Sequence, residues 1–198
     1  MAYHHGDLRN ALLDATMELV REHGARGVSV SEAARRAGVS KGAPYRHFAD
    51  RDAMLAAAAL IGFQALEARF ADFPSGQAFD AQAAWVATAY LRFAQEDPAR
   101  FETMFASGID KSRHEDLLRQ TAVVQDRFEA ALRPFLGGAD VARRSAELWS
   151  IAHGVATLAV QGNLQHVVDA DALEGVAGDA ARAWAAGCGA EGSAEGLG

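Results

Sequence analysis

The sequence predicts an all-α fold of about nine helices. Half of its 198 residues are apolar, which is enough to bury a substantial core. Alanine-rich segments place these residues three and four positions apart, the spacing of an amphipathic helix, and no β-branched run alternates as a strand would. We therefore expect helices alone, packed into one domain or two small ones.

The first expected helix covers residues 8–24. Its apolar residues recur at helical spacing and share one face, namely Leu8, Leu12, Ala15 and Leu19. This face predicts a buried seam against the helices that follow.

The second expected helix begins near Val30 and ends at Gly38. Ser29 stands three residues before Glu32, so the hydroxyl and the carboxylate can satisfy each other's backbone amides in a capping box. Gly38 tolerates the positive φ that a helix end usually requires.

The third expected helix follows after only a few residues. Ser40 offers a second N-cap, and the amides of Lys41, Gly42 and Ala43 have no partner within the helix, so they can face a phosphate. Pro44 would cost roughly 3 kcal/mol in a helix interior, but here it removes only the first intrahelical bond. We expect a helix, distorted in its first turn, that presents Lys41, Tyr45, Arg46 and His47. The small core beneath it is expected to hold Phe48, Val28, Val30, Ala34 and Val39.

Two short helices joined by a tight turn are typical of a DNA-reading helix-turn-helix. Residues 37–55, AGVSKGAPYRHFADRDAML, resemble the corresponding segment of the TetR family of bacterial transcription regulators. The resemblance includes the preceding amphipathic helix, the spacing of Tyr45 and Phe48, and the basic Arg51 that opens the next helix. The opening YHHGDLR and the later WSIAHG, residues 149–154, resemble the subgroup whose C-terminal domain is named for Trp, His and Gly.

Three features depart from the family pattern. Ala33 and Ala34 stand where many members have a bulky aliphatic residue followed by alanine, which makes the small core lighter. Pro44 replaces the usual leucine or similar apolar residue. Arg51 replaces a common lysine, which keeps the charge for a phosphate contact but alters its geometry.

The rest of the chain predicts six further helices. Asp50 can cap a long helix over residues 51–70, and Pro74 and Gly76 mark its end. The others are expected over residues 80–96, 98–106, 114–135, 140–167, capped by Asp140, and 171–186, opened by Asp171. We expect a helix-turn-helix domain over 1–50, a ligand-binding and dimerisation domain over 51–187, and a flexible tail over 188–198.

The charge and composition of the chain restrict the classes of partner that it can have. The net charge of −7 argues superficially against nucleic acid, but residues 1–55 carry eight basic and seven acidic groups, so the acidity lies in the C-terminal part. We expect strong salt dependence and weak nonspecific affinity. The single cysteine, Cys188, cannot form an intramolecular disulfide, and no apolar stretch could span a bilayer or serve as a signal peptide. The protein is expected to be cytoplasmic, with no membrane partner.

The expected DNA contacts fall on and around the third helix. They are Ser29, Ser40, Lys41, Gly42, Ala43, Tyr45, Arg46, His47 and Arg51. Lys41 and Arg46 are the candidates for guanine edges or phosphates, against a solvated helix face as the alternative. The resemblance implies phosphate contacts for Tyr45 and His47, although Tyr45 could instead lie in the core with its hydroxyl exposed. The two serines are primarily caps.

The resemblance implies that the central helices enclose a small organic effector. The candidates are aromatic, sulfur-containing or polar residues of these helices: Trp85, Tyr90, Phe93, Phe101, Met104, Phe105, Phe128, Trp149 and His153. Such residues suit an apolar pocket, but a helical bundle needs the same residues as core. His153 could bond a ligand, anchor a neighbouring helix or lie in a dimer seam.

The resemblance also implies a homodimer formed by the last two helices. The apolar candidates are Leu148, Ile151, Val155, Leu158, Leu173, Val176 and Trp184. The alternative is that they are buried within one chain. Two-fold symmetry would place two reading helices in successive major grooves, so the operator should be a palindrome or nearly so.

Catalysis finds little support in the sequence. The segment HEDLL at His114 lacks the second histidine of a zinc-protease helix, and no phosphate-cradling glycine motif occurs. We expect no enzyme, cofactor or metal. The resemblance implies a ligand-responsive repressor of transcription. Two alternatives are a constitutive DNA-binding protein without an inducer, and a small-molecule-binding dimer whose DNA-binding head has decayed.

Overall fold

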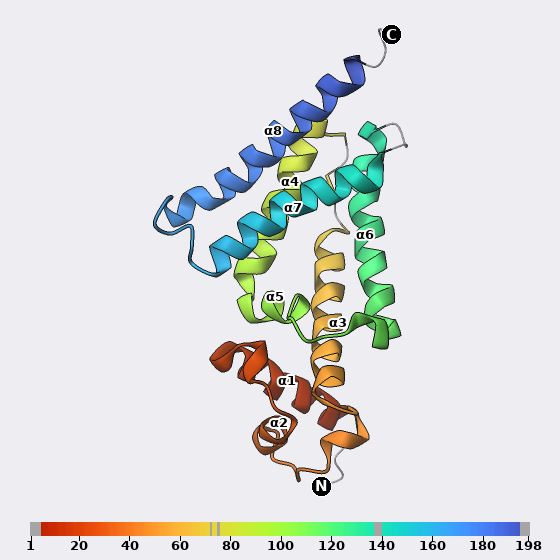
Figure 1. The fold of residues 1–198 in the computed structure, drawn as a ribbon, viewed down its shortest axis with the longest axis vertical. Helices are drawn as coiled ribbons and strands as arrows, with labels where there is room; N and C mark the ends of the chain where they lie inside the picture. Colours follow the sequence, from red (N-terminus) through yellow and green to blue (C-terminus); the bar gives the residue numbers. More distant parts are fainter. Residues whose placement is uncertain (1–4, 72, 75, 137–139, 195–198) are drawn as a thin grey trace. The chain divides into compact units, whose positions relative to one another are not determined.

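The computed structural model describes residues 5–71, 73–74, 76–136 and 140–194. Over this part of the chain it contains eight α-helices, four 3-10 helices and no strand, so the all-α expectation is confirmed (Figure 1). The α-helices are α1 (His5–His23), α2 (Val30–Arg36), α3 (Arg51–Arg69), α4 (Phe79–Glu96), α5 (Pro98–Met104), α6 (Glu115–Leu136), α7 (Val141–Val160) and α8 (Leu173–Ala194). The 3-10 helices are η1 (Ala25–Gly27), η2 (Pro44–Arg46), η3 (Lys111–Arg113) and η4 (Ala170–Ala172).

The chain divides into two compact units. Unit 1 comprises Met1–Ala65 and Asp97–Val123, and unit 2 comprises Leu66–Glu96 and Val124–Gly198. Helices α3 and α6 each contribute residues to both units. In the described residues, no helix is both long and apolar enough to cross a membrane.

The core of unit 1 is built on the predicted face of α1. Leu12 and Leu19 are fully buried, Ala15 is nearly so, and Leu8 packs against the same cluster. The cluster continues into the segment after α1 and into α3, through Val28, Val30, Ala33, Phe48, Met54 and Leu55. The expected small core is therefore present, with Val39 partly buried against it.

A close approach of α3 and α5 also shapes unit 1. A Cβ built at Gly62 of α3 would lie 2.5 Å from Cγ and 2.8 Å from Sδ of Met104 in α5. Such contacts are shorter than real side chains tolerate, so a larger residue at position 62 would have to displace the buried Met104 side chain.

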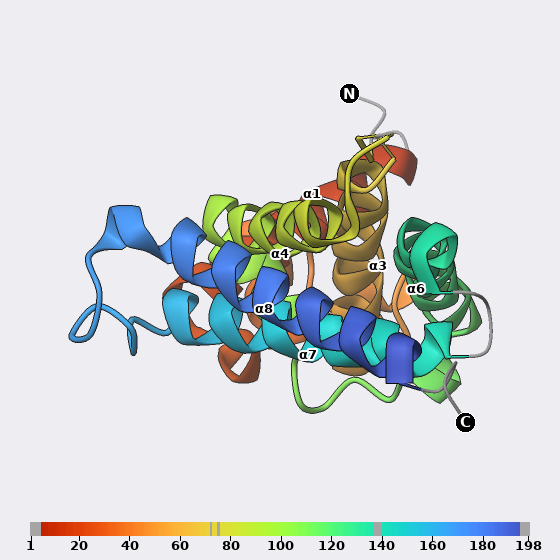
Figure 2. The same cartoon turned by 90° about the horizontal axis from the view of Figure 1, so that it is seen from above.

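Unit 2 is organised around α4, which packs against both α7 and α8 (Figure 2). Small residues allow the close approach: Ala83, Ala87, Ala177 and Ala181 are fully buried. At Gly178 of α8 an added Cβ would lie 3.5 Å from Cγ2 of Thr88 in α4.

Several helix ends differ from the sequence expectation. Helix α7 ends at Val160 instead of near residue 167, because Gly162 adopts φ 75° and the Asn163 amide bonds back to the Leu158 carbonyl. Asp140 makes no side-chain cap; its carboxylate pairs with Arg143. Helix α8 runs to Ala194 instead of about residue 186, and residues 195–198 of the expected tail lie outside the described part.

Candidate nucleic-acid interface

Helix α2 is determined at its start by local contacts. The Ser29 hydroxyl accepts a hydrogen bond from the Glu32 amide at 3.2 Å, as predicted for an N-cap. The reciprocal half of the capping box is not formed among the described residues, because the Glu32 carboxylate accepts two bonds from Arg35, at 2.9 and 2.6 Å. These contacts hold the pKa of Glu32 at about 2.

The end of α2 is equally well defined. Gly38 has φ 69°, and its amide bonds to the Arg35 carbonyl at 3.2 Å. The next amide, of Val39, reaches back to the Ala34 carbonyl at 3.0 Å. This pair of bonds is a Schellman motif, which confirms the predicted helix stop.

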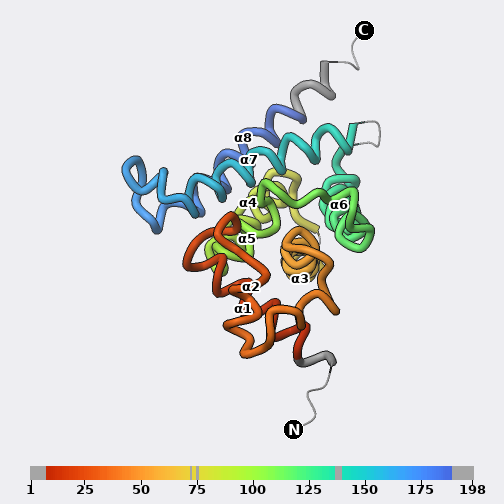
Figure 3. Tube along the Cα trace, turned by 60° about the horizontal axis from the view of Figure 1, so that its bottom comes forward, coloured from red at the N-terminus to blue at the C-terminus, as the bar shows by residue number. Residues whose placement is uncertain are grey.

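The prediction of a third α-helix is wrong. The segment after α2 is a turn followed by the single 3-10 turn η2, and no α-helix forms over residues 41–48 (Figure 3). Pro44 has no amide to give to the Ser40 carbonyl, which instead accepts the Ala43 amide at 3.0 Å. The Pro44 carbonyl accepts the His47 amide at 2.8 Å and the Phe48 amide at 2.9 Å, so a four-residue bond follows the tighter three-residue bonds only at the end of the segment.

Outward- and inward-facing side chains separate cleanly along this segment. Lys41 and Arg46 are exposed, and 59% of Tyr45 is exposed, so Tyr45 is not a core residue. Pro44 and Phe48 are buried beneath them. The Arg9 guanidinium lies over the Phe48 ring, 5.5 Å from its centroid. The turn thus presents two cations and a phenol on an apolar floor.

The remaining candidates of this group take different positions. Ser40 and Gly42 are exposed, and Ala43 is half-buried. The predicted N-cap at Ser40 is wrong, because η2 has no side-chain cap. His47 is half-buried, with its ring tilted against Phe48 at a centroid distance of 6.5 Å.

Arg51 is used inside unit 1. Its guanidinium donates to the Val28 carbonyl at 2.8 Å and to the Ala25 carbonyl at 2.6 Å. The Ala25 amide in turn donates to Oε1 of Glu102, from α5, at 2.7 Å. Arg51 and Glu102 therefore hold the backbone of the short connection between α1 and α2, a structural role that the sequence did not reveal.

Acidic groups at the start of α3 pair with the segment before α6. Asp50 caps α3 by accepting the Ala53 amide at 2.8 Å, as predicted, and this bond lowers the pKa of Asp50 together with Arg113. Asp52 accepts a bond from Arg113 at 3.3 Å and pairs with Nε2 of His114 at 2.8 Å. These pairs hold both carboxylates by contacts within unit 1.

The nine effector candidates do not form one group. Phe101, Met104 and Phe105 belong to unit 1, where Phe101 and Phe105 lie 5.2 Å apart between ring centroids. The other six belong to unit 2. There Trp85 and Phe128 each contact Phe70, a residue that the sequence did not single out, and Phe93 is buried.

Within unit 2 the structure joins three of the candidates in one hydrogen-bonded group. The hydroxyl of Tyr90 lies 2.9 Å from Nδ1 of His153 and accepts a bond from the Trp149 indole at 3.3 Å. Burial raises the pKa of Tyr90 and lowers that of His153, so both groups are neutral at pH 7. Trp149 remains 38% exposed.

The dimer candidates divide by burial. Leu148 and Leu173 are buried within the single chain and are core residues. Leu158 is 41% exposed, and the others are half-buried: Ile151, Val155, Val176 and Trp184. The Trp184 indole donates to Glu147 at 2.9 Å and its ring packs on Phe79.

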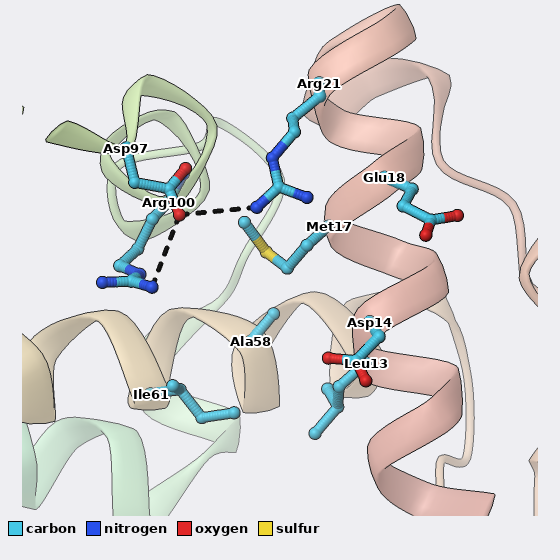
Figure 4. A pocket seen from close by; sticks show the side chains of 9 residues that line it. All are labelled: Leu13, Asp14, Met17, Glu18, Arg21, Ala58, Ile61, Asp97 and Arg100. Atoms are coloured by element: carbon cyan, nitrogen blue, oxygen red, sulfur yellow. Dashed lines mark hydrogen bonds and ion pairs between the residues drawn. The ribbon is translucent and has the colours of Figure 1, made fainter. Parts of the chain in front are cut away.

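Two grooves are lined entirely by unit 1. One, of about 430 Å³, lies between α1, α3 and the start of α5 (Figure 4). The other, of about 240 Å³, involves α1, α3 and the start of α6. Neither is lined by any of the nine effector candidates. Within the described residues, no group of three or more His, Cys, Asp or Glu side chains could hold a metal ion.

Two family models match this chain. Residues 12–58 match the model of bacterial regulatory proteins of the tetR family, and residues 83–180 match a tetracyclin repressor-like C-terminal domain. The second model carries only this general description, so the likeness to the Trp-His-Gly subgroup stays a prediction. A search of curated proteins found no match.

Solved structures share the fold along most of the chain. A protein of unknown function from Rhodococcus sp. RHA1 is 28% identical with a TM-score of 0.74, over 94% of this chain and 98% of that chain. A transcriptional regulator from the same organism is 24% identical with a TM-score of 0.68, over 86% and 91%. FadR from Bacillus subtilis, in complex with stearoyl-CoA, is 17% identical with a TM-score of 0.67, over 86% and 95%.

Proposed function

Because this chain belongs to the TetR family of bacterial regulatory proteins, we propose that it is a repressor that binds a palindromic operator as a homodimer. Binding of a small organic effector would release it from the operator. Membership of the family by itself indicates a DNA-binding regulator of transcription. The repressor role, the effector response and the dimer are our inferences.

The observation that carries the proposal is the exposed turn between α2 and α3. Lys41, Tyr45 and Arg46 are exposed on a segment whose Pro44 and Phe48 are buried. Arg46 has the donor geometry to address a guanine edge in the major groove, and Lys41 suits a phosphate. A single 3-10 turn is short, so we assign specificity chiefly to Arg46.

The proposed dimer uses the outer faces of α7 and α8. Apolar side chains remain partly accessible there: Leu158 of α7 is 41% exposed, and Ile151 and Val155 of α7 and Val176 of α8 are half-buried. A two-fold interface buries the same patch on both copies, and it presents two reading turns to successive major grooves. The operator is then a palindrome.

The proposed effector site lies in unit 2. The neutral Tyr90, His153 and Trp149 group offers hydrogen bonds within apolar surroundings, which suits a small organic molecule. The stearoyl-CoA complex of the FadR neighbour supports ligand binding by this fold. Since α3 contributes to both units, an effector that prefers one dimer conformation would change operator affinity through a population shift.

Selection of bound sequences from a random duplex pool tests the proposal. We expect an enriched palindrome, bound by a species of twice the 21.0 kDa chain mass. In anisotropy titrations, Arg46→Ala should weaken specific binding by about 1–3 kcal/mol and relax selectivity at one base position. Lys41→Ala should weaken binding to all sequences and reduce the salt slope by about one.

Arg127→Ala is the matched control, since Arg127 is an exposed arginine of α6 in unit 2, outside the turn and outside the proposed dimer faces. It should leave operator binding unchanged. Retained selectivity in Arg46→Ala would overturn the assignment of that residue. A folded dimer with no enriched sequence would favour a decayed head, the alternative that the replacement of a helix by the single turn η2 supports.

A further inference from the structure

The larger groove of unit 1, called here the α1 groove, has two poles of opposite charge and an apolar floor. Its floor is formed by Leu13 and Met17 of α1 and by Ala58 and Ile61 of α3 (Figure 4). Ile61 is 45% exposed, so it offers apolar surface to the groove. The groove holds about 430 Å³, the size of a small-molecule site.

One pole of the α1 groove is positive. The guanidiniums of Arg21 and Arg100 both contact the same oxygen of Asp97, at 3.5 and 3.4 Å. These are long contacts, and two cations share one carboxylate, so the pole keeps a net positive charge. About half of the Arg21 side chain and two-fifths of Arg100 are exposed, so an oxyanion can reach both.

The other pole is a carboxylate. Asp14 is exposed and turned toward α3 in Figure 4, and within the described residues it makes no hydrogen bond or ion pair. Glu18, one turn later, is turned the other way and lies 3.8 Å from Arg36. Asp14 and Arg21 are seven residues apart on α1, about 10 Å along the helix axis.

We propose that the α1 groove binds a linear zwitterion with an apolar middle, its ammonium at Asp14 and its carboxylate at Arg21 and Arg100. The separation of the poles selects the length of the molecule, and the floor of Met17 and Ile61 selects an apolar chain between its charges. The site lies within unit 1 and is separate from the effector group proposed for unit 2.

The probe is 8-aminooctanoate, whose extended chain places its charges at a comparable separation. We expect affinity of about millimolar, as is usual for so small a ligand. Methyl NMR of the four methionines is the readout, because Met17 lies on the floor whereas Met54 and Met104 are fully buried. The Met17 signal, assigned from the spectrum of Met17→Leu, should shift and saturate.

Asp14→Asn should weaken binding about three- to fivefold, as expected for a solvent-exposed ion pair, and Arg100→Gln similarly. Glu18→Gln is the matched control on the same helix and should bind as the wild type does. Octanoate and octylamine, each carrying one charge, should bind more weakly than the zwitterion. The Met54 and Met104 signals report that each variant is folded.

The proposal is overturned by an unshifted Met17 signal, by equal losses in Asp14→Asn and Glu18→Gln, or by single-charge probes that bind as tightly as 8-aminooctanoate. Since no DNA enters the experiment, its outcome is independent of the operator proposal.

Discussion

The two halves of the reading motif are held by different forces. Helix α2 is specified locally, by the Ser29 cap at its start and the left-handed Gly38 at its end. The turn η2 has no side-chain cap, and its position depends on the burial of Pro44 and Phe48 in the core of unit 1. The first half therefore follows from neighbouring residues, whereas the second depends on tertiary packing.

Removal of the floor beneath η2 should have the largest effect. Phe48→Ala leaves a cavity under the turn and removes the ring that Arg9 covers, so we expect a loss of about 3–5 kcal/mol in unfolding free energy. Urea unfolding followed by circular dichroism measures it. A loss below about 1 kcal/mol would mean that η2 does not rely on this floor.

Substitutions of Ser29 and Ser40 compare α2 with η2 through smaller changes in stability. Ser29→Ala should lower the unfolding free energy by about 1 kcal/mol, because it removes the α2 cap. Ser40→Ala should change it by less than about 0.5 kcal/mol, as at an ordinary surface position. Thermal unfolding of both variants measures these losses. Equal losses of stability in the two variants would contradict the conclusion that a local cap specifies α2 but not η2.

Pro44→Ala tests whether the missing amide of Pro44 causes the 3-10 conformation of η2. The restored amide can bond to the Ser40 carbonyl, while the smaller side chain loses buried area. We expect stability to change by less than about 1 kcal/mol, with slowed amide exchange at residues 45–48. Unchanged exchange across this segment would show that packing, and not Pro44, sets the 3-10 form.

The smallest effect should come from Glu32. Its hydrogen bond with Arg35, assisted by Arg36, holds its pKa at about 2, below the ordinary 4.5. The unfolded carboxyl takes up a proton as the pH falls through 4.5, whereas the native one resists until about 2. The stabilisation is therefore present above pH 4.5 and is lost between 4.5 and 2. The difference in melting temperature between wild type and Glu32→Gln should narrow over that range, and a constant difference would refute the assignment.

Local signals account for what the sequence predicted well. The buried face of α1, the Ser29 cap and the stop at Gly38 each depend on residues within a few positions of one another, and each was confirmed. The form of η2 was not predictable in this way, because a proline at that position is compatible with either a helix or a tighter turn.

Contacts between distant segments account for what was missed. Periodicity marks Phe101 and Trp85 as apolar helix residues, but it does not reveal that they belong to different compact units. The same holds for Arg51, whose charge predicts a phosphate contact although its guanidinium bonds to two backbone carbonyls. The sequence does not predict the role of Glu102, because its hydrogen-bond partner is the Ala25 amide, 77 residues away.

Arg51 and Glu102 both form hydrogen bonds with the backbone near Ala25, and this has a genetic consequence. A screen for loss of DNA binding would return substitutions at both positions, although neither side chain needs to touch DNA. Such alleles should be temperature-sensitive and suppressible by second-site mutations that stabilise unit 1, unlike a loss of Arg46. A map of DNA contacts drawn from mutant phenotypes alone would therefore extend into α5, through a residue whose side chain holds the backbone of unit 1.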